Sequence, residues 1–223
     1  MKQYIVIGAG RFGKSLAKTL MDAGQEVMVI DNDENTIQQL AEEFDNLAIV
    51  NATDETALKS IGLGNFDVAI IAIGANLRSS IMATVLAKDL GVPLVISKAQ
   101  DKLQEQVLKK VGADKVVFPE HDMGVKLAKS LMFDNLVDYI ELDQSHSIFE
   151  IRVPKQWVGK NLLELEVRDK YRINVVAVKR NDQFHVPPNP TLPLASSDII
   201  VIAGKTKVIE NIALMVAKET KNF

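Results

Sequence analysis

The chain has 223 residues, of which 47% are hydrophobic and 25% charged, so it can bury the core of one large or two small domains. Its net charge of −3 provides no basic patch, and we expect no nucleic-acid partner. It has no cysteine, which excludes disulfides, thiolate zinc sites and cysteine nucleophiles, and its three histidines lie far apart in the sequence and form no metal-ligand pattern.

The sequence also argues against a membrane-inserted protein. No signal-peptide pattern precedes the first apolar run. The longest apolar stretch, residues 68–75, is far shorter than the roughly 20 residues that a membrane helix needs. We therefore expect a cytoplasmic protein that reaches a membrane only through a partner.

Short apolar runs rich in Val and Ile alternate with amphipathic segments in the first part of the chain. The runs are residues 4–7, 27–30, 47–50, 68–73, 94–96 and 116–118. Short apolar runs without polar alternation are typical of strands buried on both faces. Because helix-like segments separate them, we predict an α/β fold with a Rossmann-type, doubly wound parallel sheet over residues 1–119.

The pattern changes after this domain. A longer helical stretch beginning at Asp122 predicts a crossover helix and connector over residues 120–138. Residues 139–223 then predict a smaller α+β domain. Its expected strands are residues 139–142, 147–153, 174–180, 184–186 and 198–203, and its expected helices are 162–169 and 208–218.

The most informative motif is a glycine-rich turn between the first expected strand and helix. Gly8, Gly10 and Gly13 have the spacing that allows a tight turn, close approach of a pyrophosphate and close helix packing. Asp31 ends the second strand, where a carboxylate can accept both ribose hydroxyls and repel a 2′-phosphate. Arg11 stands at the helix N-terminus, a position better explained if an anion binds there. The pattern predicts a site for NAD, ATP or ADP.

Catalysis has little support in the sequence. A dehydrogenase needs a general acid or base near the nicotinamide, and only His121 lies near the carboxyl end of a strand. We therefore expect a protein that is not an enzyme. An NAD-dependent oxidoreductase or NAD(H) sensor, and an assembly scaffold with a vestigial nucleotide site, stay open as alternatives.

Several segments together resemble one family, the RCK (regulator of potassium conductance) proteins, and within it the KtrA-type cytosolic subunits of bacterial potassium uptake systems. The matching segments are residues 8–13, 51–53, 72–76, 98–100, 112–114 and 119–124. The resemblance covers essentially the whole chain, and residues 139–223 correspond to the family's C-terminal (TrkA-C) domain.

The resemblance implies an octameric homo-oligomeric ring, built from dimers, beneath an integral-membrane potassium-translocating subunit. ATP and ADP would bind the first domain and hold the ring in different shapes. Arg11 would reach the terminal phosphate, Asp31 would hold the ribose, and Glu120 would place a divalent or monovalent cation beside the phosphates. The further expected nucleotide-site residues are Gly8, Gly10, Phe12, Gly13, Asp33, Asn51, Ala52, Thr53, Ala72, Gly74, Asn76 and Lys98.

The resemblance also implies two features of the later part of the chain. The crossover helix would pack against a partner subunit through an apolar stripe that includes Met123 and Leu127. Cyclic di-AMP would bind at a dimer interface of the second domain and shut transport down, although the same residues suit ordinary dimer packing. These residues are Arg168, Asn174, Val175, Val186, Pro187 and Pro188.

Overall fold

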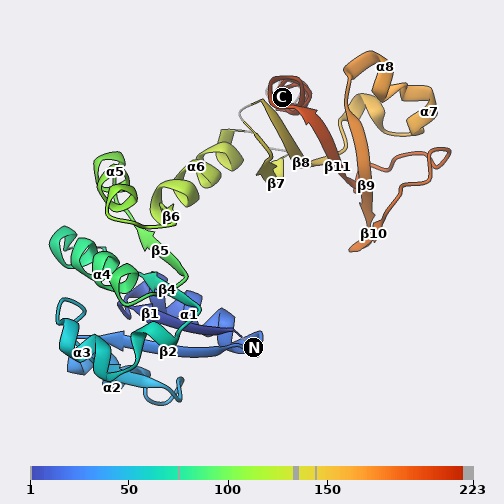
Figure 1. The fold of residues 1–223 in the computed structure, drawn as a ribbon. Helices are drawn as coiled ribbons and strands as arrows, with labels where there is room; N and C mark the ends of the chain where they lie inside the picture. Colours follow the sequence, from blue (N-terminus) through green and yellow to red (C-terminus); the bar gives the residue numbers. More distant parts are fainter. Residues whose placement is uncertain (1, 75, 133–135, 144, 218–223) are drawn as a thin grey trace. The chain divides into compact units, whose positions relative to one another are not determined.

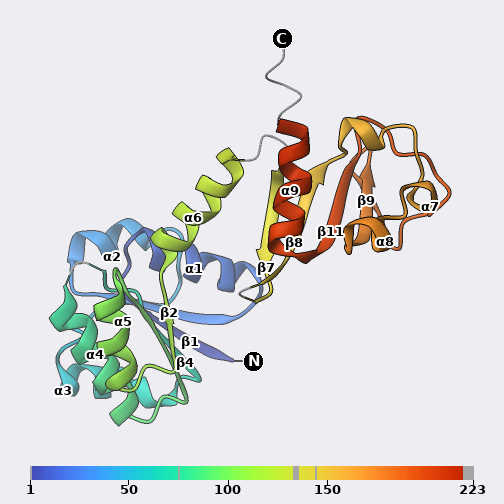
Figure 2. The same cartoon turned by 90° about the horizontal axis from the view of Figure 1, so that it is seen from above.

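The computed structural model describes residues 2–74, 76–132, 136–143 and 145–217 (Figures 1 and 2). The chain divides into two compact units, Met1–Asp122 and Met123–Phe223. Within the described ranges, no helix has the length and apolar character needed to cross a membrane. The boundaries expected at residues 119/120 and 138/139 stay predictions, and part of the expected connector, residues 133–135, lies outside the described residues.

The first unit contains a six-stranded sheet in the order β3-β2-β1-β4-β5-β6. All neighbouring strands are parallel, which confirms the predicted Rossmann-type fold. The strands are β1 (Gln3–Ile7), β2 (Glu26–Asp31), β3 (Leu47–Ile49), β4 (Val68–Ile71), β5 (Leu94–Lys98) and β6 (Lys115–Val117). The order reverses between β1 and β4, and in such sheets ligands bind at the carboxyl ends of strands beside this reversal.

Helices cover both faces of this sheet (Figure 2). Val6 and Val29 face a core shared with α1 (Arg11–Asp22) and α2 (Glu34–Leu40). Ile5 and Ile7 face the other core, together with α3 (Glu55–Ser60), the 3-10 helix η1 (Leu63–Asn65) and α4 (Leu77–Asp89). Successive side chains of a strand point to opposite faces, so these strands are apolar throughout.

Two further helices follow, α5 (Lys102–Lys110) in the first unit and α6 (Pro119–Met132), which begins in the first unit and continues past its last residue, Asp122. The predicted crossover helix begins three residues before the expected Asp122. Proline suits the first helical position because its missing N–H would have no partner there. On α6, Met123 and Leu127 are 63% and 57% exposed in the single chain.

The second unit contains a five-stranded antiparallel sheet in the order β10-β9-β11-β8-β7, which confirms the smaller α+β domain. Its strands are β7 (Leu136–Glu141), β8 (His146–Arg152), β9 (Asn174–Arg180), β10 (Gln183–His185) and β11 (Ile199–Lys205). Helix α9 (Thr206–Ala217) packs against β8 and β11. The helix expected over residues 208–218 thus begins earlier, and Lys218 lies outside the described residues.

The helix expected over residues 162–169 is instead two helices, α7 (Leu162–Leu165) and α8 (Val167–Tyr171). Glu166 separates them with φ +48°, a left-handed conformation that ends a helix. Non-glycine residues rarely adopt this conformation, so the helical periodicity gave no sign of the break. A 3-10 helix, η2 (Lys155–Trp157), precedes them and places Trp157, 2% exposed, in the core of this unit.

Candidate functional site

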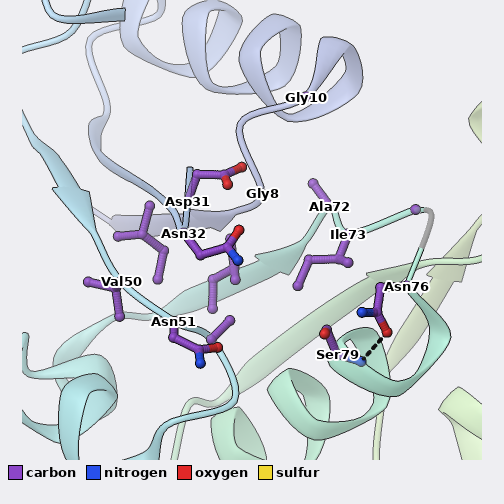
Figure 3. Close-up of a pocket in the computed structure, with 14 residues that line it drawn as sticks. Gly8, Gly10, Asp31, Asn32, Val50, Asn51, Ala72, Ile73, Asn76 and Ser79 are labelled. Atoms are coloured by element: carbon purple, nitrogen blue, oxygen red, sulfur yellow. Dashed lines mark hydrogen bonds between the residues drawn. The ribbon is translucent and has the colours of Figure 1, made fainter. Parts of the chain in front are cut away.

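A cavity of about 270 Å³ opens at the carboxyl ends of the strands of the first unit (Figure 3). It lies beside the point where the strand order reverses, between β1 and β4. Its walls come from the ends of β1 and β2, the glycine turn, the segments that follow β2, β3 and β4, and the start of α4. The lining residues are Ile7, Gly8, Gly10, Ile30, Asp31, Asn32, Val50, Asn51, Ala52, Ala72, Ile73, Gly74, Asn76 and Ser79.

Glycine occupies each of the three positions of the turn for a different structural reason. Gly8 has φ +105°, and a Cβ there would lie 3.1 Å from the carbonyl carbon of Ala72. A Cβ at Gly13 would lie 2.0 Å from the carbonyl oxygen of Gly8, so only glycine lets α1 pack this closely on the turn. A Cβ at Gly10 would meet nothing within 4 Å. Gly10 also lines the cavity, so its surface is open to a ligand.

The N-terminus of α1 has the features of an anion-binding site. The cap residue is Gly10, which has no side chain to accept a hydrogen bond from the helix, and the first turn contains no acidic residue. By contrast, Asp33, Asn76 and Asp101 cap α2, α4 and α5 with their side-chain oxygens. The first N–H groups of α1 therefore have no side-chain acceptor from the cap, and together with the helix dipole they favour a phosphate.

Asp31 connects the glycine turn to the end of β2. Its Oδ2 accepts a hydrogen bond from the Ala9 backbone N–H at 2.7 Å, and its Oδ1 accepts one from the Asp33 N–H at 3.0 Å. A carboxylate has about four acceptor positions, so it can keep both bonds and still accept a ribose hydroxyl. Asp31 thus shapes the cavity in addition to its expected contact with the ribose.

Replacing Asp31 with asparagine is expected to weaken ADP binding by about tenfold or more, because one oxygen becomes an amide that cannot accept from a backbone N–H. Isothermal titration calorimetry with ADP measures the loss. Asp45→Asn, at an exposed position away from the cavity wall, is the control and should bind like the wild type. An unchanged affinity in Asp31→Asn would contradict the role given to this carboxylate.

Two other polar side chains on the wall are held by local turns. The Asn51 Oδ1 accepts from the backbone N–H and the hydroxyl of Thr53 at 3.0 and 2.8 Å. The Asn76 Oδ1 accepts from the Ser79 N–H at 3.0 Å, as the dashed line in Figure 3 shows. Both amide nitrogens stay available as donors to a ligand.

Beside the cavity, Arg11, Phe12, Lys98 and Glu120 form a group that we call the Lys98 cluster. The Lys98 ammonium lies 2.5 Å from the Glu120 carboxylate and 5.7 Å from the centroid of the Phe12 ring. Lys98 is only 8% exposed, and its Nζ would be 3.4 Å from a Cβ at Gly74, which lines the cavity. A buried ammonium needs a partner, and Glu120 supplies it.

The charge of Glu120 is set by this cluster. The hydrogen bond from Lys98 holds the pKa of Glu120 below its ordinary value, and the more distant charge of Arg11 adds to the effect. Among the described residues, no group of three or more His, Cys, Asp or Glu side chains is placed to hold a metal ion. Glu120 is thus an ion-pair partner of Lys98 in the single chain, and a cation beside it stays a prediction.

The second unit has a cavity of about 450 Å³ at the residues expected to bind cyclic di-AMP. Four of the six expected residues line it: Arg168, Val175, Pro187 and Pro188. Val186 is 66% exposed and lies outside this wall, and Asn174 lines a different cavity. The sequence did not indicate the contributions of Leu162, Leu163 and Pro190 to the wall.

Models of two known domain families match the two parts of the chain. The TrkA-N domain model matches residues 4–119 and the TrkA-C domain model matches residues 147–215. Over 203 residues, the chain is 42% identical to Ktr system potassium uptake protein C of Bacillus subtilis, covering 91% of this chain and 92% of that protein. The chain belongs to the Ktr family of TrkA-N/TrkA-C (RCK) proteins. This membership confirms the expectation that it is not an enzyme.

Other Ktr proteins are similar over nearly the same length. Identity is 39% to Ktr system potassium uptake protein A of B. subtilis, with 94% of each chain covered. It is 32% to the protein A of Vibrio alginolyticus, covering 94% of this chain and 96% of that one. The GsuK channel shares the fold, with a TM-score of 0.54 and 18% identity, covering 97% of this chain and 39% of the longer channel chain.

Within this Ktr family member, the structure places about half of the expected nucleotide-site residues on the cavity wall. Seven expected residues are not on the wall: Arg11, Phe12, Gly13, Asp33, Thr53, Lys98 and Glu120. Asp33 caps α2, Thr53 holds Asn51, and Gly13 packs on Gly8. Ala75, within the matched segment 72–76, lies outside the described residues.

Some wall residues were not predicted. They are Ile7, Ile30, Asn32, Val50, Ile73 and Ser79. The apolar ones end or follow strands and were assigned only to the core, although a strand that ends at a cavity contributes its last side chains to the wall. Asn32 directly follows Asp31 in the sequence, and this neighbouring position could have indicated that Asn32 also lies on the wall.

Proposed function

We propose that this Ktr family chain is a regulatory subunit of a potassium uptake system and that adenine nucleotides bound at the glycine turn switch it. The observation that supports this most directly is the uncapped N-terminus of α1, which opens onto a cavity containing Asp31. This arrangement suits a phosphate chain at one end and an unphosphorylated ribose at the other.

The Lys98 cluster supplies a way to distinguish ATP from ADP. A terminal phosphate near Arg11 would compete with Glu120 for the Lys98 ammonium, and ADP lacks that group. A ligand shifts a conformational equilibrium only through its different affinity for the two states. We propose that ATP breaks the Lys98–Glu120 pair, that ADP leaves it intact, and that the two states hold the assembly in different shapes. A divalent or monovalent cation beside Glu120 stays part of the proposal, because it would offset the repulsion between the released carboxylate and the phosphates.

The remaining parts of the proposal rest on family membership. The chain would assemble through the exposed Met123 and Leu127 of α6 into dimers and then an octameric ring. This ring would lie at the inner face of the plasma membrane and bind an integral-membrane potassium-translocating subunit. Cyclic di-AMP would bind in the cavity at Arg168, Pro187 and Pro188 and inhibit transport.

The first experiment follows the thermal stability of the purified chain with ATP, ADP, NAD, NADH and cyclic di-AMP, with and without Mg²⁺ and Ca²⁺. A ligand that binds only the native state raises the melting temperature. Stabilisation by ATP and ADP supports the proposal. Stabilisation by NAD or NADH without any effect of ATP or ADP contradicts it and favours the NAD(H) sensor.

Arg11→Ala tests the switch. We expect the ratio of ATP to ADP affinity to fall by about tenfold, because a charge-assisted contact to the terminal phosphate is lost while ADP binding is largely kept. Calorimetric titrations of both nucleotides give the ratio. Lys102→Ala removes an exposed cation from the first turn of α5 and is the matched control. Equal losses for ATP and ADP in Arg11→Ala would show that Arg11 does not sense the terminal phosphate.

A further inference from the structure

A cavity of about 860 Å³ in the second unit is lined by basic side chains, and we call it the basic groove. Its walls come from the start of β8, the end of α8, the start of β9, the end of β11 and one side of α9. The basic side chains are His146, Lys170, Arg172 and Lys205. None of its lining residues is shared with the cavity at Pro187 and Pro188, so the two are separate sites.

The positive charge of the basic groove is only partly balanced. No Asp or Glu belongs to its lining. Lys170 pairs with Glu166 at 2.8 Å and His146 with Asp143 at 3.1 Å, and both carboxylates lie outside the wall. Within the described ranges, Arg172 and Lys205 have no ion pair. Cations gathered without carboxylates favour an anionic ligand.

Arg172 occupies a backbone position that suits glycine. It ends α8 with φ +55° in the left-handed region, where most helices that end this way have glycine. A non-glycine residue there stores conformational strain, and such residues gather at functional sites. The presence of an arginine at this strained position, with its guanidinium on the groove wall, is consistent with a binding role for Arg172.

The second unpaired cation, Lys205, lies on a segment that packs closely against the segment of Arg172. A Cβ at Gly204 would lie 3.0 Å from Cγ2 of Ile173 and 3.4 Å from the carbonyl oxygen of Arg172. A larger residue at this position would push the Ile173 side chain aside by a few tenths of an ångström, so glycine suits the close approach of β11 to the Arg172 segment. Lys205 follows directly, so the same contact places its backbone near that of Arg172.

We propose that the basic groove binds a small phosphorylated anion with two or more negative charges. Guanidinium and ammonium groups form strong charge-assisted hydrogen bonds with phosphate oxygens, and the side-chain amides of Asn174 and Asn211 add neutral donors. The aromatic ring of Tyr171 and the apolar side chain of Val208 give an organic part of the ligand a surface to contact. The site is distinct from the nucleotide cavity of the first unit.

Trp157 provides a local signal for a test. It is the chain's single tryptophan, and its ring centroid lies 5.4 Å from that of Tyr171, which lines the groove. The full chain is titrated with pyrophosphate while Trp157 fluorescence is followed. The double variant Arg172→Gly/Lys205→Gln removes the two unpaired cations, and its glycine relieves the left-handed position, so the fold is kept. Arg152→Gln/Lys207→Gln removes the same charge at exposed positions outside the groove and is the control.

We expect a saturable change in Trp157 fluorescence, with an affinity for pyrophosphate that falls about tenfold or more in the groove variant and less than about twofold in the control. No fluorescence change, or equal losses in both variants, would overturn the proposal. A second arm uses vesicles of phosphatidylglycerol. If the chain binds these vesicles but not pyrophosphate, the proposal is overturned, because the phosphodiester of this lipid headgroup carries only one negative charge and the groove then binds a membrane surface.

Discussion

Replacing Gly13 with alanine is expected to destabilise the first unit by about 3 kcal/mol and to lower its melting temperature by roughly 10 °C. The new Cβ would lie 2.0 Å from the carbonyl oxygen of Gly8 and 3.2 Å from the Cβ of Ala72, so either α1 or the glycine turn must move. Gly8 is fixed on its other side by the bond from its N–H to the carbonyl of Ile30 at 2.8 Å. Thermal unfolding followed by circular dichroism measures the change, and ADP affinity should fall with it.

Gly10→Ala is the matched control for this effect. A Cβ at Gly10 would meet nothing within 4 Å, and its φ of −65° suits alanine, so the stability should change by less than about 1 kcal/mol. The added methyl group would still stand on the cavity wall, where it hinders a pyrophosphate. The two variants thus separate packing from binding. Equal melting temperatures for Gly13→Ala and Gly10→Ala would contradict this division of roles.

The glycine turn shows what a sequence can reveal about a site. Its three glycines and Asp31 were predicted because each is required by local backbone geometry or by its position at a strand end. The bond from the Ala9 N–H to Asp31, 22 residues away, depends on the pairing of β1 with β2 and has no sequence pattern of its own. The Lys98–Glu120 pair is of the same kind, since β5 and α6 meet only in the folded unit.

The second unit shows where prediction from sequence is limited. Its strands were predicted from alternating polarity, as in the buried Phe149 and Ile151 of β8. The break at Glu166 was missed because a left-handed glutamate leaves the apolar spacing unchanged. The basic groove was missed too, since its four basic side chains come from three separate segments between residues 146 and 205 that become neighbours only after folding.

Replacing Asp198 with asparagine is expected to destabilise the second unit by about 3 kcal/mol at neutral pH. Asp198 is fully buried and accepts hydrogen bonds from Nε and Nη2 of Arg180 at 2.7 and 2.5 Å and from the Ala195 N–H at 2.8 Å. The variant leaves the largely buried Arg180 guanidinium without a counter-charge. Asp182→Asn, which removes the exposed partner of Lys179, should cost less than about 1 kcal/mol and serves as the control.

The pH dependence of this difference tests its electrostatic origin. The hydrogen bonds from Arg180 hold the pKa of Asp198 below the value of 3.8 typical of aspartate. The ionised carboxylate therefore stabilises the fold fully above that value, and the stabilisation is lost as the pH falls through the lowered pKa of the folded state. Urea unfolding followed by Trp157 fluorescence should show a constant gap between wild type and Asp198→Asn from pH 7 to about 5 and a shrinking gap below about pH 4. A gap that stays the same at low pH would mean that the asparagine disturbs packing, because a packing defect does not titrate.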